Sequence, residues 1–269
     1  MPAPENIDQL VYRGYWNDHL VEIEDAGNLR SLYFGSRSLQ SRMSLTTPHT
    51  LVLPYTCYMV SALLINSAPQ NALIVGIGSG SFIRFIHHHF PRCRIDAVDY
   101  SPHVISAAKD HFQLPETKRI SIHCADGRSF LQESGSRRYD LVLIDAFNDQ
   151  GMAPTVYSDL FFSLCASSLA PDGVVSCNLW SNDRERLNEI KEIFTMYFKS
   201  CLYLPVPDRG NIIGLAMPFA LPWSKICLKK KEADRLSKRF NLDVHKLIQV
   251  AKQNNLSLSK RVISWFSYP

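Results

Sequence analysis

Three aspartates and one glycine-rich run have the types and positions that chemistry on a small molecule would need. Asp99, Asp126 and Asp145 each come after a run that favours a β-strand, and residues 76–81 follow another. Glycine lets the backbone turn tightly and approach a ligand because no Cβ intervenes. A carboxylate accepts hydrogen bonds from hydroxyl and amino groups, and it can bind an ammonium ion or take its proton. These residues predict a binding cleft that contains a base.

The glycine-rich run, Gly76-Ile77-Gly78-Ser79-Gly80-Ser81, stands between a predicted strand and a predicted helix. A dinucleotide-binding loop usually has glycine or alanine where Ser81 stands. The G-x-G-x-G spacing instead favours an S-adenosyl ligand, and we expect Gly76, Gly78 and Gly80 to form part of its site. The alternative is a tight turn without a ligand.

Two of the aspartates are candidates for holding the adenosine part of such a ligand. Asp99, followed by Tyr100, ends the second strand, where a carboxylate can accept hydrogen bonds from both ribose hydroxyls. Asp126, followed by Gly127, comes after the third strand, where a carboxylate can accept a hydrogen bond from the adenine amino group. Either aspartate could instead cap the helix that follows it. We expect a cleft because these features fall at the carboxyl ends of successive strands, where open α/β sheets bind ligands.

The elements that must position these residues follow from an alternation of apolar runs and helical patterns. Strands are predicted at 72–75, 94–98, 120–123, 141–144 and 174–178, with helices that begin near Phe82, Pro102, Arg128 and Val156. This rhythm favours a parallel sheet covered by helices on both faces. After a helix at 183–198, strands at 201–205 and 212–217 are too close for a crossover helix, so they should pair antiparallel. The predicted class is α/β, with a class I S-adenosylmethionine-dependent methyltransferase-like (Rossmann-like) sheet.

The chain divides into three predicted segments. Residues 1–54 form an N-terminal β-rich segment, with a hairpin from 19–24 and 29–34 and a further strand at 38–43. Residues 55–221 form a nucleotide-binding catalytic domain that opens with a helix at 55–65. Residues 222–269 form a helical C-terminal tail, with helices at 232–240 and 243–254 whose periodicity indicates that they pack on another element.

Charge and cysteine usage exclude several classes of protein. A formal net charge of +4 is too small to indicate a nucleic-acid partner. The seven cysteines are odd in number and contain no C-x-x-C pair, so we expect reduced thiols and a cytoplasmic location. The longest apolar stretch is too short and too interrupted to span a membrane. His87, His88 and His89 point in different directions on a helix, so no metal site is expected.

The region after the fourth predicted strand carries a specific family resemblance. Residues 139–149 have the sequence Tyr-Asp-Leu-Val-Leu-Ile-Asp-Ala-Phe-Asn-Asp, followed by Gly151, Ala153, Val156-Tyr157-Ser158 and Phe161-Phe162. Together with the stretch around Gln40 and Tyr55, this resembles the spermidine synthase (polyamine aminopropyltransferase) family, in particular a bacterial spermidine synthase-like branch. The resemblance covers residues 21–217, and the tail lies outside it.

The resemblance implies a reaction and a set of roles. Family members transfer an aminopropyl group from decarboxylated S-adenosylmethionine to an amine acceptor and release methylthioadenosine, without a permanently bound cofactor. Asp145 is implied as the general base that also orients the amine. Gln40 is implied at the S-adenosyl site, and Tyr55, Asn148 and Asp149 at the acceptor site. Trp180, after the fifth strand, would either form a wall of this site or belong to the core.

A homodimer is also implied, with contact through the N-terminal segment. That segment concentrates aromatic side chains, which need a cover: Tyr12, Tyr15, Trp16, Tyr33 and Phe34.

Two departures from the family pattern reduce the expected negative charge around the acceptor. The second family carboxylate falls on Asn148, and Asp149 replaces a proline. The residues after Tyr55 also lack an acid that the family has there. We therefore expect weak binding of polyamines or a less charged acceptor. A methyltransferase on the same fold and a non-catalytic S-adenosyl-binding relative remain alternatives, and the number of carboxylates in the acceptor pocket separates the first of these from an aminopropyltransferase.

Overall fold

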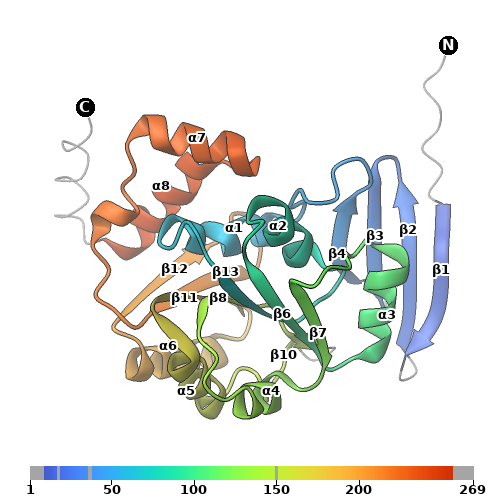
Figure 1. Ribbon diagram of the computed structural model, residues 1–269, viewed down its shortest axis with the longest axis horizontal. Coiled ribbons are helices and arrows are strands. Elements are labelled where there is room, and N and C mark those ends of the chain that lie inside the picture. Colours follow the sequence, from blue (N-terminus) through green and yellow to red (C-terminus); the bar gives the residue numbers. More distant parts are fainter. Residues whose placement is uncertain (1–8, 17–18, 36–37, 149–150, 257–269) are drawn as a thin grey trace.

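A computed structural model describes residues 9–16, 19–35, 38–148 and 151–256. Figure 1 shows a small sheet at the N-terminal end, a larger central sheet with helices on both sides, and two C-terminal helices above one end of the larger sheet. The larger sheet contains seven strands: β5 (Asn71–Val75), β6 (Arg94–Asp99), β7 (Ile120–Cys124), β8 (Tyr139–Ile144), β11 (Leu169–Trp180), β12 (Ser200–Pro205) and β13 (Asn211–Met217).

The strand order of this sheet is β12-β13-β11-β8-β5-β6-β7. The strands from β11 to β7 are parallel, whereas β13 runs antiparallel to both of its neighbours. The predicted α/β class and the antiparallel hairpin at its end are therefore confirmed. From β5 the chain moves outward to β6 and β7, and then returns to the other side of β5 at β8. This reversal places a topological switch point between β5 and β8, where such sheets bind ligands.

The core consists of two layers because alternate side chains of each strand point to opposite faces. In β5, Ala72 and Ile74 belong to one buried cluster, and Leu73 and Val75 belong to the other. The first cluster lies under α1 (Pro54–Met59), the 3₁₀ helix η1 (Val60–Leu64) and α2 (Ser81–His89). The second lies against α4 (Gly127–Glu133), α5 (Asp159–Ser168) and α6 (Arg184–Tyr197) on the opposite face (Figure 1).

Local capping explains where several helices begin. Ser101 accepts a hydrogen bond from Val104 N at 3.1 Å and precedes α3 (Pro102–His111), which begins where the sequence predicts. Helix α5 begins at Asp159 rather than near residue 156, because Ser158 is the residue that caps it. The predicted helix at 55–65 is only partly correct, since it tightens to 3₁₀ geometry at Val60.

The N-terminal sheet is an antiparallel meander of β1 (Gln9–Trp16), β2 (His19–Ala26), β3 (Leu29–Phe34) and β4 (Ser38–Ser44). Its inner side chains form a small core with Ala107 and Phe112, which belong to α3 and the residue after it. Arg30 bonds both carboxylate oxygens of Asp25 at 2.7 Å and the carbonyl oxygen of His111 at 2.7 Å. The N-terminal sheet is thereby fastened to the end of α3.

The two tail helices pack on the same core as the central sheet. Helices α7 (Lys230–Phe240) and α8 (Val244–Asn255) follow a 3₁₀ turn, η2 (Trp223–Lys225), and contribute Leu236, Phe240 and Leu247 to the first buried cluster. The side-chain amide of Asn255 accepts from Tyr203 N at 2.8 Å and donates to Tyr203 O at 3.0 Å. Asn255 thus covers part of the outer edge of β12, which would otherwise expose unpaired backbone groups.

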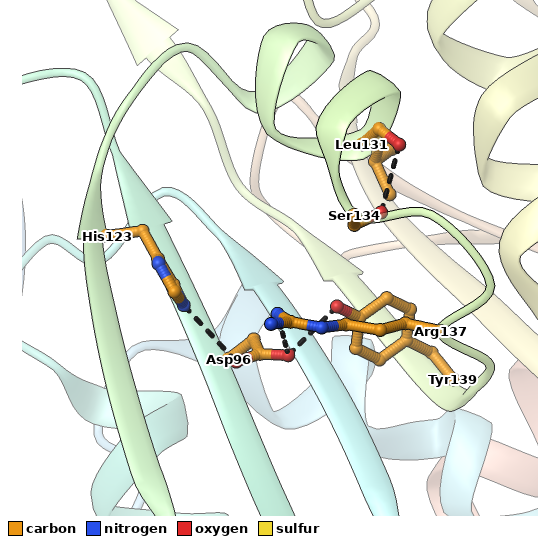
Figure 2. A network of polar contacts seen from close by, with 6 residues as sticks. All are labelled: Asp96, His123, Leu131, Ser134, Arg137 and Tyr139. Atoms are coloured by element: carbon orange, nitrogen blue, oxygen red, sulfur yellow. Dashed lines mark hydrogen bonds and ion pairs between the residues drawn. The ribbon is translucent and has the colours of Figure 1, made fainter.

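A polar network on the face opposite α2 involves the far edge of the sheet. Asp96 on β6 accepts hydrogen bonds from Tyr139 Oη at 2.9 Å and Arg137 Nη1 at 3.2 Å, and it pairs with His123 Nε2 at 3.2 Å (Figure 2). Figure 2 also shows Ser134 donating back to the carbonyl oxygen of Leu131 at the end of α4. The network joins β6, β7 and β8.

The part of the chain that the structure describes contains no helix long and apolar enough to cross a membrane. The same residues contain no group of three histidine, cysteine or acidic side chains arranged to hold a metal ion. His49 and His88 instead stack on one another with ring centroids 3.6 Å apart, and His89 packs edge-on against both.

Candidate active site

A cleft of about 780 Å³ opens at the carboxyl ends of the parallel strands. Its volume lies within the range of small-molecule sites, roughly 300–1,000 Å³. The register explains why distant residues meet there, because Val75 pairs with both Val98 and Ile144, and the residues that follow these strand ends reach the same edge. Ten of the residues expected at a site line the cleft: Gln40, Tyr55, Gly76, Gly78, Asp99, Tyr100, Asp126, Gly127, Asp145 and Trp180.

The glycine loop needs its glycines for conformation and for space. Gly76, Gly78 and Gly80 all have positive φ, at +90°, +52° and +78°, in a region that side chains other than glycine rarely adopt. A Cβ at Gly76 would lie 2.1 Å from the carbonyl oxygen of Asp145, so the loop can pass β8 only without one. A Cβ at Gly80 would lie 2.4 Å from Leu114. Gly80 is not among the residues that line the cleft.

A buried arginine supports this loop from below, and sequence reasoning missed it. Arg84 on α2 donates to the carbonyl oxygens of Pro48 at 2.7 Å, Phe112 at 2.7 Å and Ser79. Burial lowers the pKa of its guanidinium to about 9, which leaves it protonated at neutral pH. On the other side, Ser41 from the N-terminal sheet is 2.6 Å from Ser79 Oγ. The loop is therefore held between the N-terminal sheet and α2.

Asp99 is 8% exposed and binds the backbone of the segments that follow β5 and β6. Its Oδ2 accepts from Ile77 N at 2.8 Å, and its Oδ1 accepts from Ser101 N at 2.9 Å. Burial raises the pKa of the Asp99 carboxyl, and these backbone donors oppose the rise. Tyr100, beside it, also lines the cleft.

Asp126 caps a helix, which was the alternative to a ligand-binding role, and it also lines the cleft. Its Oδ1 accepts from Arg128 N at 3.0 Å and Ser129 N at 3.1 Å, which caps α4. Its Oδ2 accepts from Thr155 Oγ1 at 2.8 Å. A Cβ at Gly127 would lie 2.7 Å from Val75, so this glycine allows α4 to start close to β5.

Asp145 lies at the base of the cleft, between a tyrosine and an asparagine. Tyr55 Oη donates to Oδ2 at 2.9 Å, and Asn178 Nδ2 donates to Oδ1 at 2.8 Å. Burial raises the pKa of the Asp145 carboxyl, while the two hydrogen bonds lower it. Such a carboxyl is a stronger proton acceptor than an exposed one, and the two donors favour its ionised form.

Aromatic rings form the wall next to Asp145. Trp180 is 38% exposed, and its ring contacts Phe147 edge-on with centroids 5.8 Å apart. A Cβ at Gly151 would stand 3.4 Å from the Trp180 ring. Trp180 thus belongs to the cleft rather than to the core. The backbone of Asn148 pairs with that of Gly151 in the short antiparallel strands β9 (Phe147–Asn148) and β10 (Gly151–Met152). The Asn148 side chain and the whole of Asp149 lie outside the described residues.

The central sheet, with its cleft at the switch point, defines a class I methyltransferase-like α/β protein. Among solved structures, spermidine synthase in complex with the transition state analogue AdoDATO matches with a TM-score of 0.70 at 16% identity, over 96% of this chain and 89% of that chain. The family model of the spermine/spermidine synthase domain matches residues 55–207.

Curated relatives extend the match over most of the chain. The polyamine aminopropyltransferase of Chromobacterium violaceum is 35% identical over 240 residues, which cover 87% of this chain and 90% of that protein. The polyamine aminopropyltransferase of Neisseria meningitidis serogroup A is 34% identical over 237 residues, with the same coverage. The chain therefore belongs to the spermine/spermidine synthase family.

Proposed function

We propose that this protein is an aminopropyltransferase that uses decarboxylated S-adenosylmethionine as donor and an amine as acceptor. The observation that carries the proposal is the position of Asp145, which faces the cleft directly beside the glycine loop with Tyr55 and Asn178 as its hydrogen-bond donors. Family membership supports the same reaction. The co-substrate is consumed, so no resident cofactor forms part of the proposal.

The donor would occupy the half of the cleft that contains the loop. Gly76 and Gly78 allow the backbone to approach it, and Asp99 would accept hydrogen bonds from the ribose hydroxyls. Asp126 and Gly127 would face the adenine. Tyr100 and Gln40 line the remaining walls of this half.

The reaction needs a neutral amine, because an ammonium has no lone pair. A primary amine with a pKa near ~10.4 is mostly protonated at neutral pH. Asp145 would bind this cation and accept its proton. The amine nitrogen then attacks the carbon next to the sulfonium sulfur. A C–N bond forms, the C–S bond breaks, and its electron pair neutralises the sulfur to give methylthioadenosine. Holding the two reactants in line is the main contribution of the cleft.

The acceptor half carries little negative charge among the described residues. Three carboxylates of the described residues line the whole cleft, those of Asp99, Asp126 and Asp145, and the first two accept hydrogen bonds from the backbone on the donor side. Trp180 and Phe147 form much of the rest of the acceptor wall. We therefore expect an acceptor with less charge than a polyamine. Asn148→Asp should increase the use of putrescine, and Asn148→Ser is the neutral control.

A methyltransferase remains a second candidate, because Asp145 is the one carboxylate that the described residues place in the acceptor half, and such a site does not require a multiply charged acceptor. Calorimetry with S-adenosylmethionine, its decarboxylated form and methylthioadenosine distinguishes the donors. A product screen by mass spectrometry with several amines then identifies the transferred group. A mass increase of one methyl group, with no aminopropyl product from the decarboxylated donor, would overturn the proposal.

The proposed homodimer would use the N-terminal sheet. Tyr15 on β1 is 73% exposed, and Leu10 and Tyr12 on the same strand are also exposed. Light scattering at micromolar concentration should give twice the chain mass of 30.6 kDa, and a monomer mass would contradict this arrangement.

A further inference from the structure

Asp145 is the end of a chain of two amides, one buried and one half-buried, that starts outside the cleft. Asn211 Nδ2 donates to Asn178 Oδ1 at 2.9 Å, and Asn178 Nδ2 donates to Asp145 Oδ1 at 2.8 Å. Asn178 is 2% exposed on β11, and Asn211 begins the neighbouring antiparallel strand β13. Asn211 pairs with Trp180 in the register, so it lies diagonally across from Asn178.

The chemistry of the end group fixes the direction of this chain. An ionised carboxylate only accepts hydrogen bonds, so Asn178 must turn its Nδ2 toward Asp145. Its Oδ1 then points away and needs a donor, which Asn211 supplies. The backbone of Asn178 is fixed as well, because Tyr157 Oη donates to its carbonyl oxygen at 2.7 Å. Both the position and the orientation of the Asn178 amide are therefore determined.

We infer that Asn178 and Asn211 are positioning residues that form a one-way amide relay and hold Asp145 ionised and oriented for proton transfer. The inference rests on the proposed role of Asp145. A buried carboxyl favours its neutral form unless donors compensate. Without the relay, Asp145 would lose the donor on its Oδ1 and keep the Tyr55 hydroxyl on its Oδ2, so the balance would move toward the neutral carboxyl.

Asn211→Asp tests the relay without touching Asp145. Aspartate has nearly the same shape, but it can only accept hydrogen bonds. The Asn178 amide would then turn its Nδ2 toward residue 211 and present its Oδ1 to Asp145. Repulsion between Asn178 Oδ1 and the Asp145 carboxylate should favour the protonated carboxyl. The acid limb of the kcat/KM profile should therefore move upward by about one pH unit, a tenfold change in the protonation equilibrium of Asp145. Asn178→Ala should produce a similar shift, and Asn211→Ala a smaller one.

A titration without substrate separates this inference from the proposed reaction. The carboxyl carbons of aspartate are labelled with ¹³C, and the resonance missing in Asp145→Asn identifies Asp145. The titration midpoint of Asp145 should rise in Asn211→Asp and in Asn178→Ala. Asn255→Asp is the matched control, because Asn255 bonds Tyr203 at the edge of β12 and none of its hydrogen-bond partners among the described residues belongs to the relay. This variant should lower stability without moving the midpoint.

Unchanged midpoints in folded Asn211→Asp and Asn178→Ala protein would overturn the relay. An equal rise in Asn255→Asp would do the same, because it would show a general effect of destabilisation. If the midpoints rise as expected while wild-type protein transfers no aminopropyl group, the relay stands and the proposed reaction fails.

Discussion

Tyr55 and Asp145 are 90 residues apart in the sequence, and the tyrosine hydroxyl lies 2.9 Å from Asp145 Oδ2. Burial, followed by the nearby charge of Asp145, raises the pKa of Tyr55 well above its usual value, so the phenol stays neutral and donates. Asn178 bonds the other carboxylate oxygen. The remaining lone pairs of Asp145 are available to a ligand in the cleft, and its two partners keep the carboxylate from rotating.

Replacing the Asp145 carboxylate should lower turnover strongly and leave the affinity for the donor unchanged. In Asp145→Asn the cation loses its partner and the proton loses its acceptor, so turnover should fall by roughly 10²–10⁴-fold. Calorimetry should give an unchanged dissociation constant for methylthioadenosine, because the loop and Asp99 are intact. Wild-type turnover in this variant would show that the base lies elsewhere.

Tyr55→Phe should weaken the base without removing it. The hydrogen bond from Tyr55 lowers the pKa of Asp145, so its loss should raise that pKa and move the acid limb of the pH–rate profile upward. A hydrogen bond to a charged group contributes about 1.5–3 kcal/mol, so activity on the acid limb of the profile should fall by roughly tenfold or more. Activity should recover partly at higher pH, and a uniform loss at every pH would argue against this role.

Gly78→Val should abolish S-adenosyl binding through both strain and bulk in the cleft. Gly78 has φ of +52° and lines the cavity, so a branched side chain would enter the donor half. Gly135→Val is the matched control, because Gly135 has φ of +65° and open space around it. Both variants should lose similar stability, about 1–2 kcal/mol, whereas Gly78→Val alone should lose affinity for methylthioadenosine. Equal affinities would place the ligand elsewhere.

Asp99→Ala should weaken donor binding by two routes. It removes the proposed acceptor for the ribose hydroxyls, and it releases the backbone N–H groups of Ile77 and Ser101. A loss of about 1–3 kcal/mol corresponds to a dissociation constant about 5- to 150-fold higher. Isothermal titration with methylthioadenosine measures the change, and an unaltered constant would count against the assignment.

The histidine cluster predicts a loss of stability in acid. Burial and the neighbouring charges of His88, His49 and Arg239 lower the pKa of His89 to about 4, from an ordinary value near 6.5. Above pH 6.5 the imidazole is neutral in both the folded and unfolded states. As pH falls from 6.5 to 4, the unfolded state takes up the proton first, so the free energy of unfolding decreases. Thermal melts should show a smaller drop in Tm between pH 7 and pH 5 for His89→Phe than for the wild type.

Local sequence patterns were sufficient for most of the fold. Strands β5 to β8 lie where apolar runs predict them, and the antiparallel pair β12 and β13 follows from a connection too short for a helix. The positions of the glycine loop, of the aspartates after the strands and of the helix starts could also be predicted from local sequence. Each of these features depends on only a few consecutive residues. The predicted helix at 55–65 was less accurate, since the structure changes from α-helix to 3₁₀ helix at Val60.

The partners of Asp145 were decided only by the tertiary structure. Asn178 was predicted as the last residue of a strand, and Asn211 had no predicted role, yet the antiparallel register of β11 and β13 places them in one chain of hydrogen bonds. Arg84 likewise looks like an ordinary helix residue until three carbonyl oxygens from separate segments surround it. No local pattern marks such residues, because their function depends on groups that become neighbours only when the strands pair and the chain folds around them.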